Sequence, residues 1–391
     1  MGAHSASVGR SNTCRMTYQG SLRIMHVCAP ARSGGLETVV QMLATGLRQR
    51  GHDTVVAVVL SPREYEAHPL VEALLASDVT VHVLRVGNRD YRTERRLVRE
   101  LMRVQQTEVL HTHGFRADVV NGTLARRAGA VHVTTLHGFT ARNWRGKLYE
   151  WLQVRAARRA GAAVAVSAPI AQRVMAARPR GALSLIRNAV APPSCPLSAE
   201  DARRLLGIPA TDLLVGWIGR MSFEKGPDLM LEALRLVASR RSAASGVLRV
   251  AMIGDGPMRE AMMRAASVLP STVQVVFPGV IHQADRLLAA FDGLALTSRT
   301  EGTPMVILES MRAGIPIIAT AVGGVPDVLD DRCALLAEPN AQSIAGQLNR
   351  FEAEAVARSA RAVSARRRVE QHFGYDAWLT AYEDVYRQIL R

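Results

Sequence analysis

The chain of 391 residues lacks the cysteine patterns of a disulfide scaffold or a zinc site. Its four cysteines are scattered, with no CxxC pair, and this distribution indicates free thiols in a reducing compartment. An Asp-x-Asp sequence, the usual clamp for manganese, is also missing. These absences argue against a resident metal ion, and we expect the protein to need no metal and no bound cofactor.

Long apolar runs are absent as well. The longest one, near residues 161–171, is about half of the ~20 residues that a transmembrane helix requires. The first 20 residues are polar and have no apolar signal core, so we expect residues 1–21 to form a disordered extension. The sequence therefore predicts a cytoplasmic protein.

Acidic residues are outnumbered by basic ones, which gives a net charge of +15 and a pI near 10.7. Such an excess suits nucleic acid, an anionic membrane face or phosphorylated ligands. No RNA-binding signature accompanies the arginines, so we do not expect nucleic acid as a partner. Residues 142–159 combine five arginines and one lysine with apolar and aromatic side chains. This stretch either attaches the protein peripherally to the inner face of the cell membrane or packs on a sheet, and both interpretations stay open.

Short apolar runs alternate with helical patterns along the chain, which predicts an α/β fold built from parallel βαβ units. We expect strands at 23–30, 54–60, 79–84, 108–112, 131–136, 162–167 and 183–187, then from 213 and at 247–253, 273–277, 293–297 and 316–320. Three prolines interrupt the pattern at 189–198. The sequence thus predicts two Rossmann-like, doubly wound domains at 22–188 and 199–374, a linker between them, and a C-terminal helix at 375–391 that could cross back to the first domain.

Glycine and polar residues gather where the expected strands end. In the first half they are Gly34-Gly35, His113 and His137, and in the second half Gly219-Arg220, Gly254 and Glu301-Gly302. Ligands of open parallel sheets bind beyond the carboxyl ends of the strands. We therefore expect both sets of loops to face one interdomain cleft.

The stretch EGTPMVILE (301–309) predicts a helix start inside that cleft. Thr303 suits the N-cap and Pro304 the first helical position. The amides of Met305 and Val306 would then lack helical partners and could bind an anion.

Two carboxylates and two cations surround this predicted anion site. Glu301 precedes the helix start and Glu309 follows it, which suits a ligand with hydroxyls at both ends and phosphate between them, such as a sugar nucleotide. Arg220 and Lys225, in GRMSFEKG, suit the pyrophosphate of such a ligand, although a solvated basic loop is the alternative. Gly34-Gly35 could let backbone approach a phosphate or could form only a tight turn.

Three histidines could also be functional. His111 and His113 share one face of an expected strand, and His137 follows the next strand. A zinc site would need a third defined ligand, so we predict no metal here. His111 is expected to be buried, whereas His137 is better placed to enter the cleft.

The motifs GGLE (34–37), TLHG (135–138), GRMSFEKG (219–226), GDGP (254–257) and EGTPMVILE (301–309) together resemble the retaining family-4 glycosyltransferases of GT-B fold. The resemblance covers residues 22–390. It implies that Arg220 and Lys225 bind the donor diphosphate in place of a metal. It also implies that Glu309 binds the ribose, Glu301 binds the transferred sugar, and His137 binds that sugar or offers its carbonyl near the anomeric carbon.

The remaining implied roles concern phosphate and acceptor. Amides near Met305 and Val306, with those of Gly34-Gly35, would surround the phosphates, and His113 would lie on the acceptor side. The implied donor site also includes Gly219, Gly254, Gly302, Thr303 and Pro304. Two positions depart from the family pattern: Asn188-Ala189 where Asn-Gly is usual, and Asp327 where Glu is common.

The resemblance implies a metal-independent hexosyltransferase that moves a hexose or N-acetylhexosamine from a nucleotide-diphosphate sugar to a glycan or lipid-linked acceptor, as in cell-surface polysaccharide biosynthesis. A sugar-nucleotide epimerase shares the fold but lacks the paired glutamates with Arg and Lys upstream. A scaffold that binds sugar nucleotides or nucleic acid without catalysis is the other alternative. The residues do not identify the base, the sugar or the acceptor.

Overall fold

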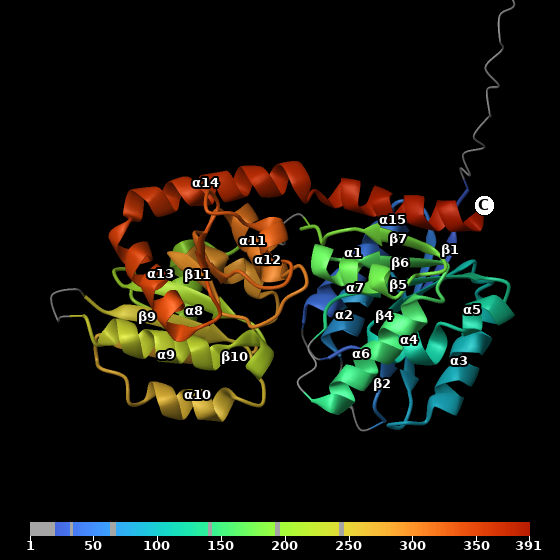
Figure 1. Cartoon of the computed structure of the whole chain (residues 1–391), viewed down its shortest axis with the longest axis horizontal. Helices are drawn as coiled ribbons and strands as arrows, with labels where there is room; N and C mark the ends of the chain where they lie inside the picture. Colours follow the sequence, from blue (N-terminus) through green and yellow to red (C-terminus); the bar gives the residue numbers. More distant parts are fainter. Residues whose placement is uncertain (1–19, 32–33, 63–67, 140–142, 192–195, 242–245) are drawn as a thin grey trace, which may run out of the picture.

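Two parallel sheets form from the two series of apolar runs (Figure 1). The structure, a computed structural model, describes residues 20–31, 34–62, 68–139, 143–191, 196–241 and 246–391. Most of the expected N-terminal extension and residues 192–195 of the expected linker lie outside the described residues. The two sheets lie side by side in separate domains, which confirms the prediction of two doubly wound parallel-sheet domains.

The first sheet has seven strands in the order β3-β2-β1-β4-β5-β6-β7, and every neighbouring pair is parallel. Its strands are β1 Arg23–Cys28, β2 Asp53–Leu60, β3 Thr80–Arg85, β4 Val109–His113, β5 Val131–Leu136, β6 Ala162–Ala165 and β7 Ala182–Leu185. The central strands are buried along nearly their whole length because helices cover both faces of the sheet. The strand order reverses beside β1, and ligands of such sheets bind at this reversal.

The second sheet has six strands in the order β10-β9-β8-β11-β12-β13, again all parallel. Its strands are β8 Leu213–Ile218, β9 Leu248–Ile253, β10 Val273–Gly279, β11 Gly293–Leu296, β12 Ile317–Thr320 and β13 Leu335–Ala337. Strand β13 was not predicted, because a run of three residues is too short to stand out in a sequence pattern.

Helices connect the strands in both domains. Those of the first domain are α1 Gly35–Gln49, α2 Pro69–Ala76, α3 Tyr91–Val104, α4 Phe115–Asn121, α5 Leu124–Arg127, α6 Trp144–Ala157 and α7 Ala168–Ala176. Those of the second domain are α8 Ala199–Leu206, η1 Phe223–Lys225, α9 Pro227–Ala238, α10 Arg259–Ala266, η3 Ala284–Ala290, α11 Met305–Ala313, α12 Val325–Val328 and α13 Ala341–Ala353. Two long helices, α14 Ala355–His372 and α15 Tyr375–Leu390, end the chain and run along one edge of both domains (Figure 1). Among the described residues, no helix is both long and apolar enough to cross a bilayer.

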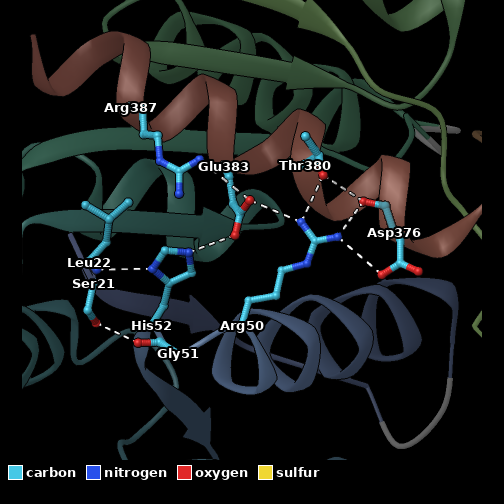
Figure 2. A network of polar contacts seen from close by, with 9 residues as sticks. All are labelled: Ser21, Leu22, Arg50, Gly51, His52, Asp376, Thr380, Glu383 and Arg387. Carbon is cyan, nitrogen blue, oxygen red and sulfur yellow. Dashed lines mark hydrogen bonds and ion pairs between the residues drawn. The ribbon is translucent and has the colours of Figure 1, made fainter. Parts of the chain in front are cut away.

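Helix α15 comes last in the chain but packs on the first domain (Figure 2). Its buried Glu383 accepts hydrogen bonds from Arg50 Nη1 at 3.1 Å and from His52 Nε2 at 2.8 Å. His52 Nδ1 accepts the amide of Leu22, so Nε2 of this ring carries the hydrogen that reaches Glu383. Arg50 Nη2 also donates to the main-chain oxygen of Asp376 at 2.7 Å. These contacts fasten the C-terminal helix to the end of α1 and the start of β2.

The chain passes between the domains at two adjacent places. Val190, after β7, donates its amide to the oxygen of Phe373 at 3.2 Å and forms a parallel bridge with Gly374. The first crossing leads into the second domain, and the second crossing leads back through α15. The two crossings therefore form one hydrogen-bonded junction.

Candidate active site between the two sheets

The loops that follow the carboxyl ends of the two sheets touch each other. Thr303 Oγ1 donates to the main-chain oxygen of Val166, which follows β6. Asn188 Nδ2 donates to the oxygen of Thr303 at 2.9 Å. Asp327 Oδ2 accepts the amide of Ala168, the first residue of α7, at 2.8 Å. The loops that we expected at one cleft are thus brought together.

Gly302 and His137 mark the closest approach between these loops. A β-carbon built on Gly302 would lie 2.2 Å from the main-chain oxygen of His137, far inside van der Waals contact. Only glycine fits at this position without a shift of the backbone. The carbonyl of His137 is therefore held against the loop that carries Glu301.

Lys225 and Glu301 form an ion pair in the second domain. Lys225 Nζ lies 2.7 Å from Oε1 and 2.9 Å from Oε2 of Glu301, and Ser298 Oγ donates to Oε1 at 2.6 Å. The Glu301 side chain is 5% exposed and that of Lys225 is 32% exposed. An ammonium has three N–H groups, so one remains for another acceptor. The structure thus joins two residues that the sequence analysis had given to different parts of a ligand.

Arg299 supports this pair and was missed by the sequence analysis. Its guanidinium donates to both carboxylate oxygens of Asp228, at 2.8 and 2.7 Å, and to the main-chain oxygen of Phe223 at 2.8 Å. It also lies over the Phe223 ring, with its central carbon 3.9 Å from the ring centre. Because Phe223 begins the short helix η1 that ends at Lys225, these contacts hold the lysine in place.

The N-terminus of α11 differs from the prediction. Thr303 is not the N-cap, because its hydroxyl donates across the cleft to Val166; Pro304 occupies the N-cap position and Met305 is the first helical residue. The first amides of the helix still lack partners within it, as at any helix start. A β-carbon built on Gly35, the first residue of α1, would lie 3.7 Å from Met305 Cγ. The starts of α1 and α11 therefore lie close together, and both helix dipoles favour an anion there.

Glu37 is a second residue that the motif analysis did not single out. It lies in the first turn of α1, and its Oε1 accepts the amide of Ala31 at 2.7 Å. Burial raises the pKa of Glu37, while the charge of Arg220 opposes the rise. Arg220 follows β8 and is exposed. The first domain thus places a carboxylate within electrostatic reach of the arginine that we assigned to the diphosphate.

The GDGP loop has a structural role beside the loop of Arg220 and Lys225. Gly254 has a φ of +132°, and a β-carbon there would lie 2.0 Å from the oxygen of Gly219. The next residue, Asp255, accepts the amide of Met221 at 2.8 Å through its main-chain oxygen. Gly219 and Gly254 therefore let two loops pack together, and their contact with a nucleotide stays a prediction.

Glu309 lies one turn into α11. Burial raises the pKa of its carboxyl to about 7, Asp285 adds to the rise, and Arg312 opposes it. Within the described residues this carboxyl makes no hydrogen bond, so both of its oxygens remain available. This is compatible with the predicted contact to ribose hydroxyls, which stays a prediction.

The histidines gather into one layer on the first sheet. His113 Nδ1 lies 3.2 Å from His137 Nε2, and His113 Nε2 lies 3.0 Å from His26 Nδ1. His111 is buried, as expected, with its nitrogens on the hydroxyls of Tyr386 and Thr135. His113 is also buried, and its predicted place on the acceptor side is not tested. His26 belongs to the same cluster and was missed, because a single histidine in an apolar strand carries no sequence signal.

Comparisons with known proteins match both halves of the chain to glycosyltransferases. Residues 33–192 match the model of the Glycosyltransferase Family 4, and residues 212–353 match that of the Glycosyl transferases group 1. A 2-deoxystreptamine N-acetyl-D-glucosaminyltransferase of Streptomyces fradiae is 38% identical over 134 residues, which cover 34% of this chain and 31% of that protein. An uncharacterized glycosyltransferase of Methanocaldococcus jannaschii is 22% identical over 77% of this chain and 80% of its own length.

Solved structures share the fold across nearly the whole chain. The Anabaena protein HepE, in complex with UDP-glucose, superposes with a TM-score of 0.78 at 20% identity over 92% of this chain and 98% of that one. In several curated relatives that are 30–38% identical, the matched part covers only 21–42% of their own length. With the two family matches on its two domains and this fold, the chain belongs to the group 1, family 4 glycosyltransferases of GT-B fold.

Proposed function

We propose that the protein transfers a hexose or N-acetylhexosamine, with retention of configuration, from a nucleotide-diphosphate sugar to a glycan or lipid-linked acceptor. The reaction would belong to cell-surface polysaccharide biosynthesis. The observation that carries the proposal is the ion pair of Lys225 and Glu301, which joins a cation for phosphate to a buried carboxylate for sugar hydroxyls. It lies on the loops of the second domain, and the Glu301 loop packs on His137 of the first.

The same contacts favour a reaction without a metal. Breaking the bond between the anomeric carbon and the diphosphate leaves negative charge on the phosphate oxygens. Lys225, Arg220 and the starts of α1 and α11 supply positive charge or dipole for these oxygens. Lys225, through its ion pair, and the two helix starts are fixed by the fold, so little reorganisation is needed at these groups as the charge develops.

Retention follows in this proposal from attack on the face that the leaving group occupied. A new bond forms between the anomeric carbon and the acceptor oxygen, and the acceptor proton passes to the departing phosphate. In this proposal Glu301 forms no covalent bond to the sugar: its carboxylate is paired with Lys225 and Ser298, and its remaining lone pairs would accept hydrogen bonds from sugar hydroxyls. Its role is to hold the sugar.

The names of similar proteins guide the choice of donor. HepE was solved with UDP-glucose, and the Streptomyces relative transfers N-acetylglucosamine. We therefore expect a UDP-linked hexose or N-acetylhexosamine to be the first donor to try, with GDP- and ADP-sugars as comparison.

Helix α6 supports attachment to an anionic membrane face. Its side chains Trp144, Leu148, Tyr149 and Trp151 are 44–69% exposed. Leu148 and Trp151 thus do not pack on the sheet, whereas Leu152 is half-buried and Gln153 anchors the helix through Asp118 at 2.8 Å. Arginines lie beside the exposed rings, as in the pair of Arg155 and Trp151. Exposed aromatic groups together with cations are typical of interfacial helices.

The test is incubation of the purified protein with UDP-, GDP- and ADP-sugars, with and without added glycan or lipid-linked acceptors. Release of nucleotide from one donor, and its loss in Lys225→Met, would support the proposal. Arg235→Met is the matched control, because Arg235 forms an exposed ion pair with Glu232 away from the site. Absence of release with every donor, in protein that is folded, would refute it.

A further inference from the structure

A chain of three histidines links the interior of the first sheet to the cleft. His26 lies on β1, His113 ends β4, and His137 follows β5, and these strands are neighbours in the sheet. The two contacts of 3.0 and 3.2 Å run from His26 Nδ1 to His113 Nε2 and from His113 Nδ1 to His137 Nε2. The rings are tilted by 30° and 34° to each other. The row of three histidines therefore has two nitrogens at its ends that contact no other histidine of the row, Nε2 of His26 and Nδ1 of His137.

The two ends lie in different surroundings. His26 Nε2 is buried and has no hydrogen-bond partner among the described residues. His137 is partly exposed, and its Nδ1 is not among the buried unpaired atoms. Burial lowers the pKa of His26 to about 3 and that of His137 to about 4, and it holds the pKa of His113 well below its usual range. All three rings are therefore neutral near pH 7, each with one N–H and one bare nitrogen.

Neutral rings in such a chain must all point the same way. If His26 donates from Nδ1 to His113, then His113 donates from Nδ1 to His137, and His137 keeps its hydrogen on Nδ1. If the order is reversed, the unpaired Nε2 of His26 carries a buried N–H instead. Orphaned buried backbone N–H groups are rarer in proteins than under-satisfied carbonyl oxygens, and we apply the same preference to the ring nitrogens. The first arrangement is therefore favoured, and the buried Nε2 of His26 determines the tautomer of His137.

We propose that His26 and His113 are positioning residues that fix His137 as the neutral Nδ1–H tautomer, so that His137 acts as a hydrogen-bond donor to a sugar or phosphate oxygen and not as a general base. This inference rests on the proposed glycosyl transfer. It gives a reason for histidine at a buried position such as His26, where an apolar residue would otherwise pack equally well. It also agrees with a reaction in which the leaving phosphate accepts the proton of the acceptor.

A metal ion is the competing use of this cluster. His26, His111 and His113 bring ligand nitrogens within 4.8 Å of one another. Five of their six nitrogens, however, already lie on other hydrogen-bonding groups: two on His111, two on His113 and Nδ1 of His26. No carboxylate or thiolate lies among these contacts. The hydrogen-bonded chain thus uses the nitrogens more completely than a metal would.

The experiment is nitrogen-15 NMR of histidine-labelled full-length protein at pH 7, which reports the tautomer of each ring without substrate. The expected result for His137 is an Nδ1–H ring. In His26→Leu the chain loses its donor, so we expect the His137 signals to move to a mixture of tautomers and transfer to fall roughly tenfold. In His26→Asn the side-chain amide replaces the Nδ1–H, so the tautomer and the rate should be restored.

His132→Leu is the matched control, because His132 is a buried histidine of the same sheet that contacts Thr112 outside the chain. It should leave the signals of His137 unchanged. An Nε2–H tautomer of His137 in the wild-type protein would overturn the proposal, and that result needs no variant to fold. So would an unchanged tautomer in His26→Leu, or one equivalent of tightly bound metal in the purified protein. If no donor is turned over, the tautomer results still decide this inference separately.

Discussion

Removing Lys225 should affect both stability and transfer, and the structure sets the size of each effect. Lys225→Met would leave the Glu301 carboxylate, which is 5% exposed, with the Ser298 hydroxyl as its one hydrogen-bond donor among the described residues. Breaking a buried ion pair costs about 3–5 kcal/mol, and partial exposure of the lysine reduces this to about 1–3 kcal/mol. Glu301→Gln should lower the free energy of unfolding by less, because the ammonium of Lys225 that remains can reach water. Each change should lower transfer by roughly 100-fold or more, as expected for groups aimed at a developing charge.

The assay is a double-mutant cycle with urea unfolding and initial transfer rates. Lys225→Met with Glu301→Gln should recover part of the stability lost in Lys225→Met, because no buried charge is left unpaired, while its rate should not fall by the product of the two single effects. The exposed pair of Arg235 and Glu232 gives the control cycle, with little change in the free energy of unfolding and no change in rate. Near-wild-type turnover in either folded single variant would refute the placement of the donor site.

Three further outcomes are expected. Transfer should continue in the presence of EDTA, because Lys225 and Arg220 would neutralise the charge of the diphosphate. Activity that is lost on chelation and restored by manganese would contradict this. The protein should co-sediment with anionic liposomes and be released by salt, whereas Trp151→Ser should bind less; protein that stays in the supernatant at every lipid composition would exclude attachment. Thermal stability should fall between pH 7.5 and 5.5, because burial keeps His26 and His113 neutral in the fold while their unfolded rings bind protons below about 6.5. Over this pH range each ring lowers the free energy of unfolding by about 1.4 kcal/mol. Glu309, whose pKa is raised to about 7, gains its proton in the folded state and offsets part of this loss. A thermal unfolding midpoint that is independent of pH would refute the prediction.

The fold was predictable because its signals are local and repeated. Each long strand is an apolar run of several residues between helical patterns, and the parallel arrangement follows from their alternation. The short β13 escaped because it has no such run. The alanine at the family's usual glycine position was a concern for the junction, but Ala189 is not among the residues with positive φ. Its β-carbon is therefore tolerated there.

The site was predictable where one motif carries both the residue and its place. Lys225 and Glu301 were proposed from such motifs, and the structure brings them into a direct contact that the motifs did not predict. The prediction that Thr303 caps α11 was wrong because its hydroxyl donates to a carbonyl of the other domain. Helix-capping rules consider only residues that are neighbours along the chain, so they could not predict this contact. Arg299 and His26 bind partners far away in the sequence, and Glu37 faces the distant charge of Arg220. Such pairings exist only after the sheets have formed.

The position of α15 connects these parts of the molecule. The helix follows the second domain in the chain, yet its Tyr386 hydroxyl lies 2.7 Å from His111 in the histidine layer of the first domain. Its other end begins at the junction where Val190 meets Gly374. A rotation of the two domains about this junction would have to break the hydrogen bonds of Thr303 with Val166 and of Asp327 with Ala168, while the contacts of Glu383 keep α15 on the first domain. Since Asn188 next to the junction holds the oxygen of Thr303, such a rotation would act directly on the loop that carries Glu301.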